Sequence, residues 1–129
     1  MREIRSDRVP APAGTYSQAI EHGGFVFLAG QGPFSASGER AGQTFAEQAR
    51  LTFENLKLVA QAAGTDLSGT VRLGVYLSSL DHFEEFNLIA REYLTEPYPA
   101  RTTLQVALQG FDIELDAVVA MQVNPEEAR

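Results

Sequence analysis

The sequence predicts one α+β domain in which two helices cover one face of a mixed β-sheet. Its 129 residues suit one domain and are too few for two ordinary ones. Apolar residues alternate with period two in several segments and recur at intervals of three and four in two others. These segments follow one another as strands, helix, strand, helix and strands, so we expect residues 1–129 to form a single domain.

The first third of the chain predicts an extended start followed by a hairpin. Residues 1–15 are polar and punctuated by proline, which favours extended backbone. Two glycines at 23–24 supply the positive φ angles of a tight turn. The apolar strand 25–29 follows this turn and should stop at Gly30-Gln-Gly-Pro33, before a Ser- and Gly-rich loop over 34–42.

The first helix is marked at both ends. Thr44 and Glu47 have the spacing of a capping box, in which a hydroxyl and a carboxylate satisfy free amides at the helix start. Gly64 stands where a C-terminal cap is expected. Between them, one apolar stripe is formed by Ala49, Phe53, Leu56, Ala60 and Ala63.

The second half repeats the pattern. Residues 71–77 alternate with period two, so the odd-numbered side chains should share one face. Asp81-His-Phe-Glu84 repeats the capping-box spacing and predicts a helix to about Leu94. Two alternating strands are then expected, over 101–108 and 113–121. The sheet face away from the two helices would be bare in a monomer, which indicates an oligomer.

A polar group is expected on the last two strands. If they form a hairpin around Gln109-Gly-Phe111, one register sets Arg101, Thr103, Glu114 and Asp116 on the same face. Such a group has two interpretations. One is a cross-strand salt bridge, worth about 0–1 kcal/mol when exposed. The other is a guanidinium that binds a substrate carboxylate beside a carboxylate that handles water.

Other candidate positions have both structural and functional interpretations. Gly30 and Gly32 do not make a phosphate loop, because Ser35 replaces a third glycine and the next helix begins about ten residues away. Gly30 either forms a turn or exposes a backbone amide to a ligand. Tyr16 can be a packed aromatic, and Asn87 a structural amide, if they do not belong to a site.

Composition excludes several classes of function. The chain has no cysteine, so thiol catalysis, disulfides and thiolate metal sites are absent. His22 and His82 lack partners with metal-ligand spacing, so no metal site is expected, and no Ser–His–Asp pattern is present. A net charge of −7 and a pI near 4.7 argue against nucleic acid as a partner.

No segment predicts a membrane or export signal. Acidic residues interrupt the N-terminal arginines, and no apolar run follows that could serve as a signal core. No stretch reaches the eighteen or more apolar residues of a membrane span. We therefore expect a cytoplasmic protein.

Taken in order, these segments resemble the RidA/YjgF family of reactive intermediate deaminases. The resemblance spans nearly the whole chain, and its landmarks are Ala11-Pro-Ala-Gly-Thr-Tyr-Ser-Gln18, Leu28-Ala-Gly-Gln31, Phe53-Glu-Asn-Leu56, Phe86-Asn-Leu-Ile89, Tyr98-Pro-Ala-Arg-Thr-Thr103 and Ile113-Glu-Leu-Asp-Ala117. It implies a chorismate-mutase-like fold of the bacillus type. It also implies a homotrimer that packs three sheets into a barrel, with ligand sites in the clefts between subunits.

The resemblance also implies roles for particular residues. Arg101 matches the arginine that anchors a substrate carboxylate, and Glu114 matches the acidic residue that positions or activates water. Gly30 matches a glycine whose backbone lines the cleft, and Tyr16 a tyrosine that closes it across the interface. Asn87 matches a helix asparagine near the cleft.

Two departures from the family pattern concern the same cleft. Thr103 stands where many members carry cysteine, and its hydroxyl can hold a water molecule through a hydrogen bond. The loop 109–111 is shorter than in typical members. Both departures bear on the subgroup and on the preferred substrate.

The activity implied is hydrolysis of 2-imino acids and their enamine tautomers to 2-keto acids and ammonia, without a cofactor. Three alternatives remain open. The first is a non-catalytic ligand-binding or chaperone-like trimer, and the second is an enamine deaminase of one degradative pathway. The third is an endoribonuclease, which the acidic charge and the lack of a catalytic histidine pair disfavour.

Overall fold

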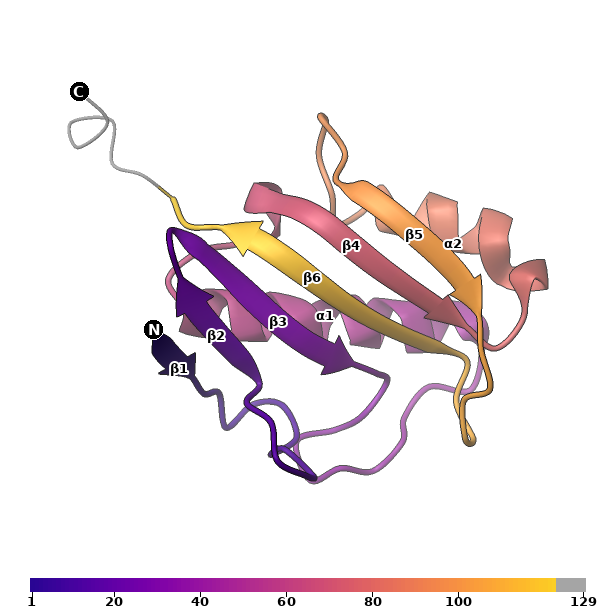
Figure 1. Ribbon diagram of the computed structural model, residues 1–129. Helices are drawn as coiled ribbons and strands as arrows, with labels where there is room; N and C mark the ends of the chain where they lie inside the picture. Colours follow the sequence, from indigo (N-terminus) through magenta and orange to yellow (C-terminus); the bar gives the residue numbers. More distant parts are fainter. Residues whose placement is uncertain (123–129) are drawn as a thin grey trace.

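The computed structural model describes residues 1–122 and contains one six-stranded sheet with two α-helices on one face (Figure 1). The predicted order of strands and helices is confirmed. The elements are β1 (Arg2–Ile4), β2 (Ala19–His22), β3 (Phe25–Gln31), α1 (Phe45–Ala62), β4 (Thr70–Leu77), α2 (Phe83–Ala90), β5 (Ala100–Gln105) and β6 (Ile113–Ala120). The strand order is β1-β2-β3-β6-β4-β5, and only the β4–β5 pair is parallel.

The first three strands form an antiparallel edge of the sheet. The predicted hairpin is confirmed, since Gly23 and Gly24 turn with φ of 63° and 84° between β2 and β3. The N-terminal segment contains a strand that the sequence did not predict, because Arg2 pairs with Glu21 and extends the sheet by β1. Strand β3 also runs past the predicted stop, with a register shift between Leu28 and Gln31.

Helix α1 begins and ends as its sequence predicts. The backbone amide of Glu47 donates to Thr44 Oγ1 at 3.1 Å, while Glu47 Oε2 accepts from the Gln43 amide at 3.1 Å. The Glu47 carboxylate therefore accepts the amide of Gln43, the residue before the N-cap Thr44, instead of the Thr44 amide itself. Gly64 has φ of 89° just after the helix. The predicted stripe is the core face of the helix, and all five of its residues are at most 3% exposed.

Removal of the cap hydroxyl should destabilise the protein. We expect Thr44→Ala to lower the free energy of unfolding by about 1 kcal/mol, because one amide at the helix start loses its acceptor. Denaturant unfolding followed by circular dichroism measures this change. Thr44→Ser should keep most of the stability, and an unchanged midpoint in Thr44→Ala would show that water satisfies that amide equally well.

The second helix is shorter than predicted and is capped differently. Ser79 Oγ accepts the Asp81 amide at 3.1 Å and starts a 3-10 turn over Leu80–His82, so the expected capping box at 81–84 does not form. Helix α2 begins only after this turn and ends at Ala90. The chain then continues to Leu94 in tight turns instead of a regular helix.

The predicted hairpin between the last two strands is wrong, because β4 lies between β5 and β6. A polar network holds the start of β6 against β4. Asp112 Oδ1 accepts from Ser78 Oγ at 2.7 Å, and Asp112 Oδ2 accepts from Gln48 Nε2 at 3.1 Å. The Gln48 Oε1 atom accepts the Asp112 amide at 2.9 Å. Asp112 is thus tied to the end of β4 and to α1 at once, and β6 pairs with β4.

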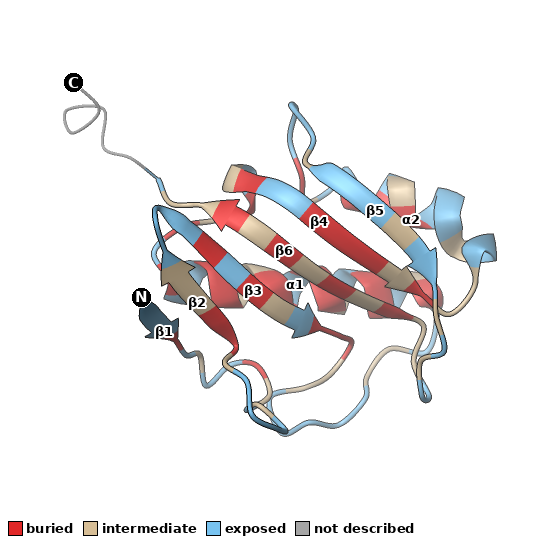
Figure 2. Ribbon diagram, viewed as in Figure 1, coloured by how far each residue is buried: buried red, intermediate tan, exposed pale blue. Residues whose placement is uncertain are grey.

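The hydrophobic core lies between the sheet and the helices. In β4 the odd-numbered residues Leu73, Val75 and Leu77 are fully buried, as predicted. Val71 departs from this pattern and is 44% exposed, because a register shift between Thr70 and Arg72 turns it away from the core. Buried and exposed residues alternate along β3 in Figure 2.

No helix formed by residues 1–122 covers the other sheet face. This face presents Phe25, Phe27 and Leu104, which are 40%, 48% and 48% exposed. Exposed aromatic side chains of this kind normally mark a surface that associates with a partner. None of the helices formed by residues 1–122 has the length and apolar character needed to span a membrane.

Candidate functional site

The structure divides the predicted site residues between the two faces of the sheet. Arg101 pairs in register with Leu73, whose side chain faces the helices, so Arg101 lies on the helix-covered face. Glu114 pairs with Tyr76, which has the opposite parity to Leu73 on β4, so Glu114 lies on the open face. The expectation that Arg101 and Glu114 share one face within a chain is therefore wrong.

The parity within each strand is confirmed. Thr103 pairs with Val75 and lies on the same face as Arg101. Asp116 pairs with Gly74 and lies on the same face as Glu114. The structure thereby also rules out the cross-strand salt bridge between Arg101 and Glu114 within one chain.

Glu114 lines a cavity of about 310 Å³ together with two other predicted site residues, Tyr16 and Gly30. The full lining is Pro10, Ala11, Ala13, Tyr16, Gln18, Gly30, Gln31, Gly32, Phe34, Gly38 and Glu114. No basic side chain is among these residues. Among residues 1–122, no cation lines this cavity to stabilise the charge of a carboxylate.

The environment of Glu114 favours its protonated form. Burial raises the pKa of Glu114 above its ordinary value, and the negative charge of Asp116 raises it further. Asp116 itself accepts a hydrogen bond from the Tyr76 hydroxyl at 3.0 Å. A carboxyl group with a raised pKa beside a cavity is typical of a group that transfers protons.

Gly30 makes room for this carboxyl group. A Cβ atom at position 30 would lie 2.8 Å from Glu114 Oε2, closer than such atoms approach one another in proteins. The glycine therefore lets the Glu114 side chain pack closely against the backbone of β3. This reason was not among the two interpretations of Gly30 that the sequence offered.

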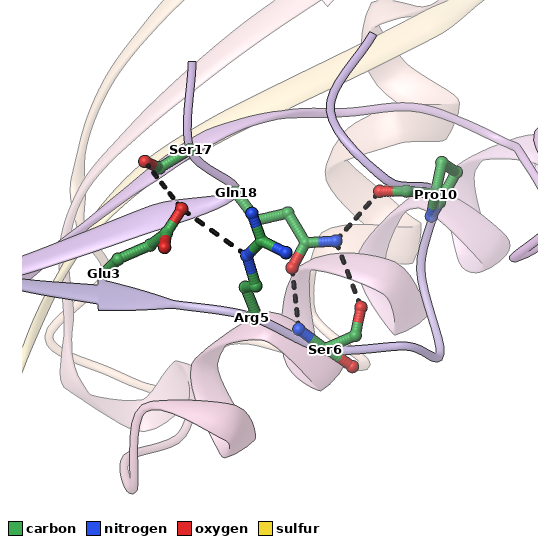
Figure 3. Close-up of polar contacts among 6 residues, drawn as sticks. All are labelled: Glu3, Arg5, Ser6, Pro10, Ser17 and Gln18. Atoms are coloured by element: carbon green, nitrogen blue, oxygen red, sulfur yellow. Dashed lines mark hydrogen bonds and ion pairs between the residues drawn. The ribbon is translucent and has the colours of Figure 1, made fainter. Parts of the chain in front are cut away.

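The buried Gln18 also lines the Glu114 cavity. Figure 3 shows its hydrogen bonds to Ser6 and Pro10. Its Nε2 atom donates to the Ser6 carbonyl at 3.1 Å and to the Pro10 carbonyl at 2.9 Å. Its Oε1 atom accepts the Ser6 amide at 2.7 Å. One side chain thus fixes the segment that leads to Pro10 and Ala11 in the cavity wall.

Tyr16 lines the same cavity. Its hydroxyl accepts the Ala13 amide at 3.1 Å, and its side chain is more than half exposed. Tyr16 is therefore not the packed aromatic of the structural interpretation. Gly32 and Phe34 also line this cavity, and the buried Asn55 Nδ2 holds their loop by donating to the Gly32 carbonyl at 3.0 Å and the Phe34 carbonyl at 2.8 Å.

Arg101 lines a second cavity of about 340 Å³ near α2, together with Asn87. The full lining is Asn87, Ala90, Arg91, Leu94, Tyr98, Pro99 and Arg101. The Arg101 guanidinium lies 5.3 Å from the ring centre of Phe83 and 5.2 Å from that of Phe86. Contacts at this distance orient the cation without neutralising it.

Arg101 is available to bind an anion. Within residues 1–122 it makes no ion pair, and partial burial lowers its pKa from the ordinary value. A guanidinium remains charged at physiological pH under such a shift. Its planar fork can donate two parallel hydrogen bonds to a carboxylate.

The histidines make no metal site. His82 stacks on Phe45 with ring centres 4.2 Å apart, and the exposed His22 is the last residue of β2. Within residues 1–122 no three His, Asp or Glu side chains are grouped closely enough to hold a metal ion.

Known proteins resemble this chain over nearly its whole length. The sequence model of the family described as Endoribonuclease L-PSP matches residues 6–121. A RutC family protein, y4sK of Sinorhizobium fredii, is 38% identical over 92% of this chain and 96% of its own. A protein of Dermatophagoides farinae named 2-iminobutanoate/2-iminopropanoate deaminase is 30% identical over 94% of this chain and 97% of its own.

The fold is also that of solved relatives. The crystal structure of RidA from the Antarctic bacterium Psychrobacter sp. superposes with a TM-score of 0.87 at 36% identity. The match covers 94% of this chain and 100% of the Psychrobacter chain. The resemblance read from the sequence landmarks is confirmed, and the chain belongs to the RidA/YjgF/RutC family, whose sequence model is described as Endoribonuclease L-PSP.

Proposed function

We propose that the protein hydrolyses 2-imino acids, and their enamine tautomers, to 2-keto acids and ammonia. The observation that carries this proposal is the carboxyl group of Glu114, whose pKa is raised in a cavity without a basic residue. A relative named 2-iminobutanoate/2-iminopropanoate deaminase, 30% identical, supports the same substrate class. A 2-imino acid also carries a carboxylate, and Arg101 in the second cavity is a cation that can bind it.

The proposed site is completed between subunits of a homotrimer. Within one chain, Arg101 and Glu114 lie on opposite faces of the sheet, so one chain alone cannot bring both to one substrate. The open face exposes Phe25 and Phe27, and β5 pairs on only one of its edges. Association of the sheets would cover those side chains and could place the Arg101 cavity of one subunit beside the Glu114 cavity of the next.

The reaction requires a water molecule and two proton transfers. Arg101 holds the substrate carboxylate, and Glu114 in its ionised form takes a proton from water as the water oxygen bonds to the imine carbon. The substrate enters as the protonated imine, so the electron pair of the C=N bond moves to nitrogen and leaves a neutral amine, which then receives the proton from Glu114 and becomes an ammonium group. The ionised Glu114 then takes the hydroxyl proton as the C=O bond forms and the C–N bond breaks, and ammonia is released. The Thr103 hydroxyl, on the face of Arg101, would help to hold the water.

One coupled assay tests this function. A threonine dehydratase generates 2-iminobutanoate from threonine, and the release of 2-ketobutyrate and ammonia is timed with and without the protein. We expect faster release than by spontaneous hydrolysis, together with a trimer mass in analytical ultracentrifugation. Release at the spontaneous rate by a correctly folded protein would overturn the proposal, and tight 2-keto acid binding in that case would favour a ligand-binding trimer.

The pH dependence should respond to Asp116. The base form of Glu114 is needed, so kcat/KM should rise with pH through the pKa of Glu114. Because Asp116 raises that pKa, Asp116→Asn should lower it and move the rise to lower pH. Asp81→Asn, in the exposed 3-10 turn, is the matched control and should leave the profile in place. If the parent, Asp116→Asn and Asp81→Asn proteins had the same pH profile, a group other than Glu114 would control the rise of kcat/KM with pH.

The description of the family model makes ribonuclease activity the second candidate. The net charge of −7 disfavours it, since RNA binding gains most from basic side chains. RNA cleavage that survives repurification and is lost in Glu114→Gln would favour it. RNA cleavage that is equal in the parent and Glu114→Gln proteins would indicate a contaminating nuclease.

A further inference from the structure

The cavity of Arg101 contains a second arginine. Arg91 lines the same space of about 340 Å³, and no acidic side chain does. The whole chain carries 17 acidic and 10 basic residues, so two cations without an acid form an unusual grouping for this protein. The other lining residues are one amide, one phenol and apolar side chains.

The nearest acid in the sequence does not neutralise Arg91. Glu92 is engaged by Arg50, with Nε to Oε1 at 3.1 Å and Nη2 to Oε2 at 2.9 Å. Within residues 1–122, Arg91 makes no ion pair of its own. Both cations that line the cavity are therefore free to bind an anion.

The backbone fixes where Arg91 stands. It is the C-cap of α2, and it follows Asn87 by four residues, so both side chains belong to the same side of the helix end. An arginine at a helix C-terminus gains about 0.3–1 kcal/mol from the helix dipole. That gain accounts for a cation after α2, but it does not account for a second cation in the cavity of Arg101.

We infer that the preferred substrate is a 2-imino dicarboxylic acid, with Arg101 on the carboxylate next to the imine and Arg91 on the distal carboxylate. This inference rests on the proposed function and names its substrate class. Two cations in one cavity repel each other, and a dianion that binds both removes this repulsion. A monocarboxylate would leave Arg91 without a partner.

The experiment compares two imines that differ in the distal carboxylate. D-Aspartate oxidase acting on D-glutamate generates 2-iminoglutarate, and D-amino-acid oxidase acting on D-2-aminobutyrate generates 2-iminobutanoate. Trapping of the remaining imine with semicarbazide reports each rate. We expect the kcat/KM of the unsubstituted protein to be at least tenfold higher for 2-iminoglutarate than for 2-iminobutanoate.

Arg91→Gln removes the charge and keeps a helix-compatible side chain. It should lower the ratio of the two kcat/KM values by about tenfold or more, the effect of losing a charge-assisted hydrogen bond. Arg8→Gln makes the same change of charge outside this cavity and should leave the ratio unaltered. Equal ratios in the parent and Arg91→Gln proteins, or a parent preference for 2-iminobutanoate, would overturn the inference.

Calorimetry separates this inference from the proposed function. The products 2-oxoglutarate and 2-oxobutanoate are titrated into each protein. If no imine is hydrolysed faster than spontaneously, but 2-oxoglutarate binds more tightly and Arg91→Gln removes that preference, the proposed function fails and the dicarboxylate site stands. If both imines are hydrolysed equally well, the proposed function stands and the inference about Arg91 fails.

Discussion

Glu114→Gln is expected to lower kcat for imine hydrolysis by about 10²- to 10⁴-fold, the range that a positioned general base contributes. The amide keeps the size of the side chain beside Gly30 but cannot take a proton from water. The coupled dehydratase assay, with the spontaneous rate subtracted, measures the loss. Glu54→Gln, on the exposed side of α1, is the control and should retain the parent rate.

The same variant should not lose stability at neutral pH. Folding raises the pKa of Glu114, so this group favours folding below its unfolded pKa of about 4.3 and loses that contribution as pH rises through the folded pKa. The uncharged amide avoids the cost of burying a carboxylate. We therefore expect a Tm at neutral pH equal to or above that of the parent. A large fall in Tm would mean that lost activity reports unfolding instead of lost chemistry.

Arg101→Ala is expected to lower kcat/KM for 2-iminobutanoate by at least about 100-fold, because two charge-assisted hydrogen bonds of roughly 1.5–3 kcal/mol each are lost. Arg101→Lys should lose about 10- to 100-fold, since an ammonium cannot form the planar fork. Steady-state kinetics and calorimetric titration of 2-oxobutanoate measure the two effects. Binding should weaken in the same order as the kinetics.

Arg8→Lys is the control for the lysine substitution, because Arg8 lies outside the Arg101 cavity. It should match the parent in both measurements. Arg101→Lys and Glu114→Gln proteins that fold and both deaminate at the parent rate would remove these two residues from the proposed site. A loss of affinity in Arg101→Lys without a loss of kcat would instead assign Arg101 to binding alone.

Local features of the fold could be predicted because they depend on residues close together in the chain. The capping of α1 by Thr44 needs only a hydroxyl and an amide three residues apart. The β2–β3 turn needs only two glycines with positive φ. The second helix shows the limit of such patterns. Both Ser79 and Asp81 have side chains that can cap a helix, and Ser79 caps a 3-10 turn that comes before the helix.

The face of its own strand on which each polar residue lies was predicted correctly, but the arrangement of the two strands was not. Period two correctly placed Arg101 with Thr103, and Glu114 with Asp116. It could not show that β4 separates the two strands. The pairing of β6 with β4 joins residues far apart in the sequence, as do the hydrogen bonds of Asp112 to Ser78 and Gln48.

The sequence by itself determined the family, the order of the elements, the ends of α1 and the residue types that can hold a carboxylate and move a proton. Only the tertiary structure decided which strands are neighbours, and therefore that Arg101 and Glu114 lie in different cavities on opposite faces. The physical reason is that alternation assigns side chains to the two sides of one strand. The strand's neighbours, and the face that the helices cover, are chosen by packing between distant segments.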